Sequence, residues 1–257
     1  MKKKIIHIFK NIPFIFILYK KFLLRFLKYK YSKNKIKYFK LYIKNKKKFI
    51  NETLPPLNGQ KNRIKIISQI LRSKTISKIY ETGSLHGSSA LFFSKFQIPV
   101  YTCEISKDAY LIAKDRLKKN KKTKIINCSS ILFLKKLKKN NKQTFFYLDA
   151  HGPILKNPLL VELDFIFNKF SNFIIMIDDF QIPSDYEYGY DSDYGRALNL
   201  NYIKKFVNNN VVIFFPKIKA KFETGYKRGS IVLSRGKKCI QLCNSINDLA
   251  KHDPLVS

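Results

Sequence analysis

Acidic residues are scarce in this chain of 257 residues, where 17 Asp and Glu stand against 51 Lys and Arg. A generic surface would scatter so few acids, but nine of them fall at or just beyond the carboxyl ends of strands predicted below. Ligands bind at that edge in open α/β sheets, so we expect the functional site there. The nine acids are Glu81, Glu104, Asp149, Asp178, Asp179, Asp185, Glu187, Asp191 and Asp193.

Arginine is also scarce, with seven residues in a chain whose net charge is +34. Such a charge is typical of nucleic-acid-binding proteins, but arginine is the better reader of phosphates and bases. Abundant Lys, Ile, Asn, Phe and Tyr indicate an A- and T-rich coding bias that raises lysine everywhere. We favour a solvated lysine surface over a nucleic-acid groove, and RNA stays an alternative partner.

The chain has only four cysteines. Cys103 and Cys128 lie in apolar strand patterns and are expected to be buried thiols. Cys239 and Cys243 lack the second pair that a zinc site needs. Since no disulfide framework is indicated, we expect a reducing, cytoplasmic compartment.

The first 50 residues contain no acid and mix lysine with Phe, Ile, Leu and Tyr. The apolar run Ile12–Tyr19 is too short to span a bilayer, and no small-residue cleavage site follows it. Residues 1–50 therefore form either an interfacial helix at the inner face of a membrane or a helical appendage packed on the core or on a second subunit. We expect a linker at 51–62, a main domain at 63–236 and a C-terminal tail at 237–257.

From Arg63 onward the apolar pattern alternates between helix and strand spacing. Strands are expected at residues 76–80, 100–103, 124–128, 144–148, 173–177, 211–215 and 230–233. Helices are expected at Arg63–Ser73, Ser88–Lys95, Lys107–Asn120, Ile131–Leu137, Pro158–Phe170 and Ala197–Asn208. The last two strands have no helix between them and should be antiparallel neighbours. Five βα units before such a pair predict an α/β fold with a mostly parallel sheet.

A glycine-containing turn joins the first predicted strand to the next helix, in the sequence KIYETGSLHGSS from Lys78 to Ser89. Gly83 permits a tight turn, and the helix start after Gly87 offers unpaired N–H groups. Glu104 follows Gly83 by about 20 residues, the distance at which an acid accepts hydrogen bonds from ribose hydroxyls. The alternative for Glu104 is an exposed strand-end residue. Glu81 either faces a ligand amino group or orders the turn.

Two further blocks place acids at strand ends, YLDAHG with Asp149 and His151, and IDDF with Asp178 and Asp179. The three carboxylates could share a divalent cation such as Mg²⁺. His151 is a candidate general base for a hydroxyl group, because its pKa lies near working pH. The alternative for His151 is a hydrogen bond that orders the loop.

These residues together resemble a class I S-adenosylmethionine-dependent methyltransferase over roughly residues 63–235. Besides the glycine turn, Glu104 and the two acidic blocks, the resemblance includes PLxxEL, GYDxxYG and ETGxxRG, which begin here at Pro158, Gly189 and Glu223. The blocks are also similar to those of bacterial sugar O-methyltransferases. The sequence departs from the family in lacking an acid after the third strand and the usual middle glycine of the turn.

The resemblance implies a Rossmann-like, doubly wound sheet of seven strands with an antiparallel last strand. It implies that the donor S-adenosylmethionine contacts residues of the turn and of the following strand ends. These cofactor-binding candidates are Glu81, Gly83, Ser84, Gly87, Ser88, Glu104, Ser129 and Asp149. Asp149, His151 and Asp178 are the catalytic candidates, and Asp149, Asp178 and Asp179 are the metal candidates.

The expected activity is methyl transfer to a hydroxyl group of a small molecule or of a sugar or polysaccharide precursor. Tyr186, Tyr188, Tyr190 and Tyr194 suggest a loop that closes over this acceptor. The alternatives are an RNA methyltransferase that uses the lysine surface, and a nucleotide-binding protein without methyl transfer. A homo-oligomer and peripheral membrane contact through residues 1–50 are further expectations.

Overall fold

The computed structural model describes residues 37–150, 157–183, 185–207 and 210–252. The chain divides into two compact units, Met1–Lys37 and Tyr38–Ser257, and nearly all described residues belong to the second. The predictions for residues 1–36 therefore lie outside the described part of the chain. No helix within the described residues is long and apolar enough to cross a membrane.

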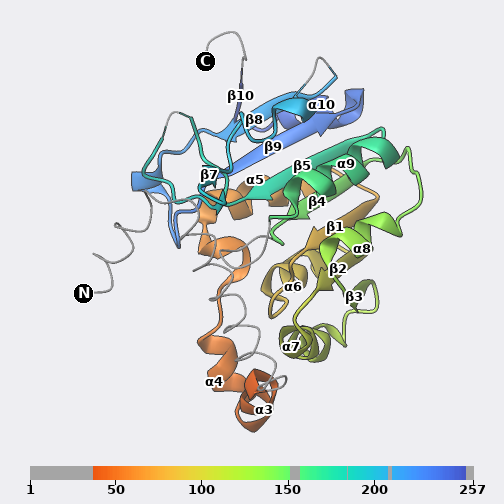
Figure 1. Ribbon diagram of the computed structural model, residues 1–257, viewed down its shortest axis with the longest axis vertical. Helices are drawn as coiled ribbons and strands as arrows, with labels where there is room; N and C mark the ends of the chain where they lie inside the picture. The colour runs from red at the N-terminus through yellow and green to blue at the C-terminus, as the bar shows by residue number, and fades with distance from the viewer. Residues whose placement is uncertain (1–36, 151–156, 184, 208–209, 253–257) are drawn as a thin grey trace. The chain divides into compact units, whose positions relative to one another are not determined.

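The second unit is built on one mixed sheet of eight strands in the order β10-β8-β9-β5-β4-β1-β2-β3 (Figure 1). The strands are β1 Lys78–Thr82, β2 Val100–Glu104, β3 Thr123–Asn127, β4 Thr144–Leu148, β5 Phe173–Asp178, β8 Val212–Pro216, β9 Ser230–Arg235 and β10 Leu249–Lys251. The first five are mutually parallel, and β9 runs antiparallel to both β5 and β8. The predicted fold class and the antiparallel pair are confirmed.

An eighth strand extends the predicted seven. β10 pairs antiparallel with β8 at the edge of the sheet, and it follows α10, Lys237–Asn244. The segment predicted as a C-terminal tail thus supplies a helix and a strand to the same sheet.

The central strands β1, β4, β5 and β9 are buried on both faces, and their successive residues enter opposite layers. Tyr80 and Phe146 belong to one apolar cluster, while their neighbours Ile79 and Phe145 belong to the other. The first cluster includes side chains of α8, Ser130–Lys135, and α9, Leu159–Lys169. The second includes side chains of α5, Lys61–Arg72, α6, Ser88–Ser94, and α10. This two-sided burial explains why the strands read as continuous apolar runs.

Most predicted helices are present within a few residues of their expected ends, including α7, Lys107–Leu117. The predicted helix at Ala197–Asn208 is wrong. That region begins at the end of β7, Arg196–Ala197, which pairs with β6, Ser192–Asp193, and it continues into the 3₁₀ turn η2, Lys204–Phe206. The Asn199 side chain accepts a hydrogen bond from the Tyr202 N–H and donates to Gln181. Such local side-chain bonding competes with helix formation.

Two short helices precede the main domain, α3 at Lys37–Lys44 and α4 at Lys46–Asn51. The backbone N–H groups of Tyr38 and Phe39 donate to the Asp108 carboxylate on α7. The Tyr42 side chain is buried, and its hydroxyl donates to Asp115 at 2.7 Å. For this described portion the structure thus shows packing on the core, one of the two arrangements predicted for residues 1–50.

The cysteines are all free thiols. Cys103 is buried as predicted, whereas Cys128 is only half-buried. Cys239 and Cys243 are buried on α10 and pack into the second apolar cluster. They therefore act as small apolar side chains there.

Candidate functional site

The glycine turn after β1 packs directly against the end of β4. Gly83 has a φ of +79°, and a Cβ added to it would lie 2.3 Å from the backbone oxygen of Asp149. The N–H groups of Gly83 and Ser84 both donate to the Cys103 oxygen on β2. Glycine is required here because the turn has no room for a side chain and adopts a left-handed conformation.

Gly87 supports the same turn for a different reason. Its φ is +77°, and an added Cβ would lie 3.1 Å from the Ala113 Cβ on α7. Gly87 therefore allows α6 and α7 to approach closely. The hydroxyl of Ser88, the first residue of α6, accepts a hydrogen bond from Arg116 at 3.2 Å.

Glu104, at the end of β2, holds the turn in place. Its two carboxylate oxygens accept hydrogen bonds from the N–H groups of Leu85 and Ser106, both at 2.8 Å. The side chain is 7% exposed, so the interpretation as an exposed strand-end residue is wrong. Burial raises the pKa of Glu104, although its backbone hydrogen bonds oppose that shift. Each carboxylate oxygen can accept a second hydrogen bond, so ribose binding remains chemically available.

Glu81 is 1% exposed, and its carboxylate accepts a hydrogen bond from the Thr102 hydroxyl at 2.5 Å. Burial raises the pKa of Glu81 to about 7. Its described contact lies within the sheet, between β1 and β2. Contact between Glu81 and a ligand stays a prediction.

A pocket opens between the glycine turn and the segment of residues 54–58. Residues 83–86 and the start of α6 form one wall, Leu54 to Asn58 form the other, and Asp149 closes the end. Ser84 lines this pocket, and its hydroxyl is buried and has no hydrogen-bond partner among the described residues. Because buried polar atoms are nearly always paired, an orphaned hydroxyl here marks a position for a ligand.

Asp149 lies at the carboxyl end of β4, beside this pocket. Burial raises its pKa well above its usual value, and the nearby charges of Asp178, Asp179 and Glu81 raise it further. The strand ends thus bring four of the predicted acids close enough to interact.

His151 lies outside the described residues, and its role as a base stays a prediction. Ser129 caps the N-terminus of α8 by accepting from the Leu132 N–H, and adenine binding there also stays a prediction.

Asp178 is the centre of a buried polar network. It forms an ion pair with Arg63 and accepts hydrogen bonds from the Tyr147 hydroxyl, from Asn58 and from the Asp179 N–H. Its side chain is fully buried. A catalytic role through direct contact with substrate does not fit this burial, and the contacts indicate that Asp178 positions its neighbours.

The metal site predicted from Asp149, Asp178 and Asp179 does not fit the contacts of these residues. The Arg228 Nε donates to Asp179 at 2.6 Å, and another guanidinium nitrogen of Arg228 pairs with Asp191. Among the described residues, no group of three His, Cys, Asp or Glu is arranged to hold a metal ion. Arginine side chains, rather than a metal ion, neutralise the acids at the end of β5.

The segment predicted as a linker is bonded to the loop before β9. It carries the 3₁₀ turn η1, Pro56–Gly59, whose Leu57 is buried. The Asn58 oxygen accepts from the Tyr226 N–H at 3.0 Å, and the Thr224 hydroxyl donates to the Gly59 oxygen at 2.9 Å. Thus the linker forms a wall of the candidate site.

The same loop caps α5, which has no capping side chain of its own. The Lys61 N–H donates to the Thr224 hydroxyl at 2.8 Å, and the Asn62 N–H donates to Glu223 at 3.3 Å. The ETGxxRG block therefore has a structural explanation in this chain. It supplies the cap for the helix that carries Arg63.

Sequence reasoning missed Asn58, Arg63 and Arg228 as parts of the site. One available signal was the scarcity of arginine in a lysine-rich chain. Arg63 and Arg228 donate to buried or half-buried carboxylates, and Arg116 and Arg235 donate to backbone oxygens. The planar arginine side chain donates several hydrogen bonds in a fixed geometry, and a lysine side chain cannot replace it at such positions.

Comparisons with known proteins identify the fold. No protein-family model matches the chain, and a search of curated proteins found no match. A candidate O-methyltransferase from Klebsiella pneumoniae has a TM-score of 0.50 at 13% identity, covering 72% of this chain and 84% of that protein. An O-methyltransferase from Bacillus cereus, solved with SAH, has a TM-score of 0.48 at 16% identity, covering 68% and 80%. The O-methyltransferase TomG from Streptomyces achromogenes, solved with SAM, has a TM-score of 0.48 at 12% identity, covering 68% and 79%. The strand order and the likeness to the structure with a TM-score of 0.50 show a Rossmann-like methyltransferase fold, and at 13% identity this likeness shows the fold alone.

Proposed function

We propose that this protein is an S-adenosylmethionine-dependent methyltransferase that acts on a hydroxyl group of a small molecule or of a sugar or polysaccharide precursor. The observation that carries the proposal is the pocket at the glycine turn, which is lined by Ser84, a residue whose buried hydroxyl has no hydrogen-bond partner among the described residues. Supporting it are the acids at the ends of β1, β2 and β4, and the strand order shared with a methyltransferase fold.

Two residues of the pocket, Ser84 and Asp149, and two acids at the neighbouring strand ends, Glu81 and Glu104, offer groups that suit such a donor. The Ser84 hydroxyl can bond to a polar group of the ligand, and Glu104 can accept from ribose hydroxyls. Asp149 and Glu81 place negative charge, when ionised, beside a cationic donor. The donor supplies an electrophilic methyl group carried on a sulfonium. The protein would then mainly align the acceptor oxygen with that methyl group.

Magnesium has no part in this proposal, because arginines already engage two of its three candidate ligands. Asp149 and His151 are the remaining candidates for removing the acceptor proton. The raised pKa of Asp149 suits a general base better than that of an ordinary surface carboxylate.

The test is calorimetric titration with S-adenosylmethionine, S-adenosylhomocysteine and NAD. We expect heat with the first two and none with NAD. Ser84→Ala should weaken S-adenosylhomocysteine binding by about 2- to 10-fold, the value of one hydrogen bond. It should leave unfolding free energy unchanged or slightly higher, since an unpaired buried group is removed.

Ser245→Ala, at the exposed C-cap of α10, is the matched control and should change neither quantity. Binding of NAD without S-adenosylhomocysteine would favour the nucleotide-binding alternative instead. Absence of heat with both methyl-donor ligands on folded protein would overturn the proposal.

A further inference from the structure

Five large aromatic side chains stand exposed on two neighbouring loops beside the candidate site. Their exposed fractions are 75% for Tyr186, 39% for Tyr190, 51% for Tyr194, 68% for Phe222 and 59% for Tyr226. We call these five residues the aromatic platform. Large exposed apolar side chains that are grouped on neighbouring loops are typical of binding surfaces.

Hydrogen bonds between the two loops hold the platform in place. The Ala220 N–H donates to Asp185 at 2.8 Å, and the Gly189 N–H donates to the Lys227 oxygen at 2.9 Å. The Gly229 N–H donates back to the Gly189 oxygen at 2.8 Å. Bonds on both sides of the rings fix the loop backbones, so the exposed rings lie on a preorganised surface.

One tyrosine of the predicted closing loop is not part of this surface. Tyr188 is 3% exposed, and its hydroxyl donates to the Ile218 oxygen at 3.1 Å. This hydrogen bond from Tyr188 joins the first loop to the second. The second loop contributes two exposed aromatic residues to the platform, Phe222 and Tyr226.

The second loop presents lysines to the solvent, whereas the first carries the exposed Glu187 and no lysine. Lys221 and Lys227 are exposed, and the Lys221 Nζ lies 4.9 Å from the centre of the Phe222 ring. The acids of the same loops are largely used internally, with Asp185 bonded to Ala220 and Glu223 bonded at the cap of α5. The second loop is therefore both aromatic and cationic, and its exposed lysines outnumber the one exposed acid of the first loop.

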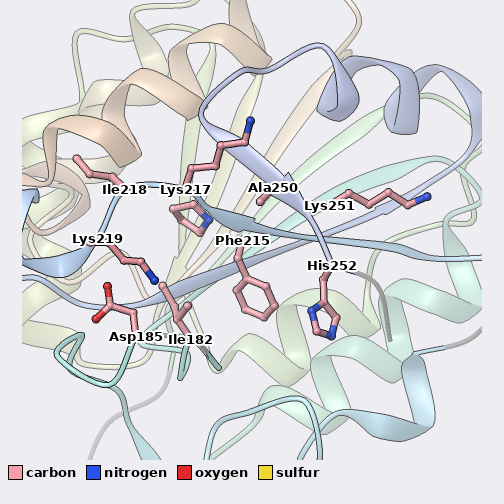
Figure 2. Close-up of a pocket in the computed structure, with 10 residues that line it drawn as sticks. Ile182, Asp185, Phe215, Lys217, Ile218, Lys219, Ala250, Lys251 and His252 are labelled. Carbon is pink, nitrogen blue, oxygen red and sulfur yellow. The ribbon is translucent and has the colours of Figure 1, made fainter. Parts of the chain in front are cut away.

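A cavity of about 260 Å³ lies beside the platform, between these loops and strands β8 and β10. Phe215 and Ile182 line it with apolar surface (Figure 2). Lys219 and Asp185 stand on one side of the Phe215 ring, and His252 stands on the other. Asp185 directly precedes Tyr186 in the chain, so the cavity continues the platform.

We propose that the platform and this cavity bind an acidic glycan, a chain of sugar units that carries carboxylate or phosphate groups. Aromatic rings stack on the C–H faces of sugars, and lysines attract their anionic groups. Single-stranded RNA is less suited, because Arg228 already bonds two carboxylates, which leaves the exposed Arg196 as the one other described arginine of the two loops. Arg228 is bonded to Asp179 and Asp191, and Arg196 is paired with Asp193. The inference rests on the proposed function and names the class of its acceptor.

The test is titration of the full chain with a hexamer of galacturonic acid, with neutral maltohexaose and with a uridine hexanucleotide. We expect binding of the acidic hexamer that is at least about tenfold tighter than that of the other two. The double variant Phe222→Ser/Tyr226→Ser should weaken this binding about tenfold or more, and Tyr38→Ser, at an equally exposed tyrosine on α3, should not.

Lys221→Gln/Lys227→Gln should weaken binding and reduce its salt dependence, whereas the exposed pair Lys95→Gln/Lys142→Gln should not. Equal or tighter binding of the uridine hexanucleotide, or no effect of the aromatic variant, would overturn the inference. Self-association that the aromatic variant abolishes would also overturn it, since a second copy would then occupy the platform. S-adenosylhomocysteine is titrated separately, so failure of that binding with glycan binding intact would count only against the proposed activity.

Discussion

The guanidinium of Arg63 and the carboxylate of Asp178 form an ion pair whose two side chains are 1% and 0% exposed. The pair joins α5 to the end of β5, residues that lie 115 positions apart in the chain. Arg63 also donates to the Arg228 and Gly229 oxygens, so three segments meet at one side chain. A buried charge with this many partners fixes how the site is assembled.

Arg63→Met should be strongly destabilising, because it leaves the Asp178 carboxylate buried without its counter-charge. We expect a loss of about 3–5 kcal/mol in unfolding free energy, measured by urea denaturation at neutral pH. Arg72→Met, at the exposed end of the same helix, should change it by less than about 0.5 kcal/mol. Adding Asp178→Asn to Arg63→Met should recover part of the loss. Equal effects of the two arginine variants would show that the pair contributes little.

Thr224→Val should weaken the start of α5, because the Lys61 N–H loses its capping oxygen. A lost cap costs about 1 kcal/mol, and the change keeps the side-chain volume nearly constant. Thr75→Val, at another half-buried threonine, serves as control. Thermal unfolding followed by circular dichroism measures both. Indistinguishable midpoints for the two variants would mean that the long-range cap is not energetically significant.

The sequence allowed the sheet to be predicted because its signals are local. Apolar runs such as Phe173–Ile177 identify strands buried on both faces, and the glycine turn identifies the edge where ligands bind. The pairing of Asn58 with Asp178 spans 120 positions, and that of Lys61 with Thr224 spans 163. No local pattern encodes such contacts, so a wall of the site was interpreted as a linker. The helix predicted at Ala197–Asn208 is wrong for a different, more local reason, since the Asn199 side chain bonds to the nearby Tyr202 N–H and to Gln181.

Stability should depend on pH through Glu81. Its pKa rises from 4.5 to about 7 on folding, so the folded protein holds this proton more tightly than the unfolded chain. The contribution of Glu81 to the free energy of unfolding is therefore largest below about pH 4.5. It declines as the pH rises toward 7, by roughly 3 kcal/mol at most. Glu81→Gln should remove this decline. Urea denaturation of the original protein and of the variant at about pH 5 and about pH 8 measures this decline. If the two proteins lose the same unfolding free energy between these pH values, the raised pKa of Glu81 is contradicted.

Removal of divalent cations should leave the protein unaffected. Arg63 and Arg228 already pair with Asp178 and Asp179, so neither carboxylate is available to Mg²⁺ without breaking an ion pair. We expect the same affinity for S-adenosylhomocysteine, and the same rate of methyl transfer to any acceptor found, in EDTA and in excess Mg²⁺. A loss in EDTA that Mg²⁺ restores would show that the arginines are displaced in the working enzyme.

Gly83 and Gly195 form a matched pair for testing how closely the turn packs. Both have positive φ, +79° and +86°, so an alanine at either position carries similar backbone strain of about 1–2 kcal/mol. A Cβ at Gly195 would meet nothing within 4 Å, whereas a Cβ at Gly83 would lie 2.3 Å from the Asp149 oxygen. Gly83→Ala should therefore cost more than Gly195→Ala by at least about 1–3 kcal/mol, the penalty of overpacking. Only Gly83→Ala should also weaken S-adenosylhomocysteine binding, because relief of the clash must move the turn away from Asp149. Urea denaturation and calorimetry measure the two effects, and equal losses at both glycines would mean that the turn and the end of β4 can separate freely.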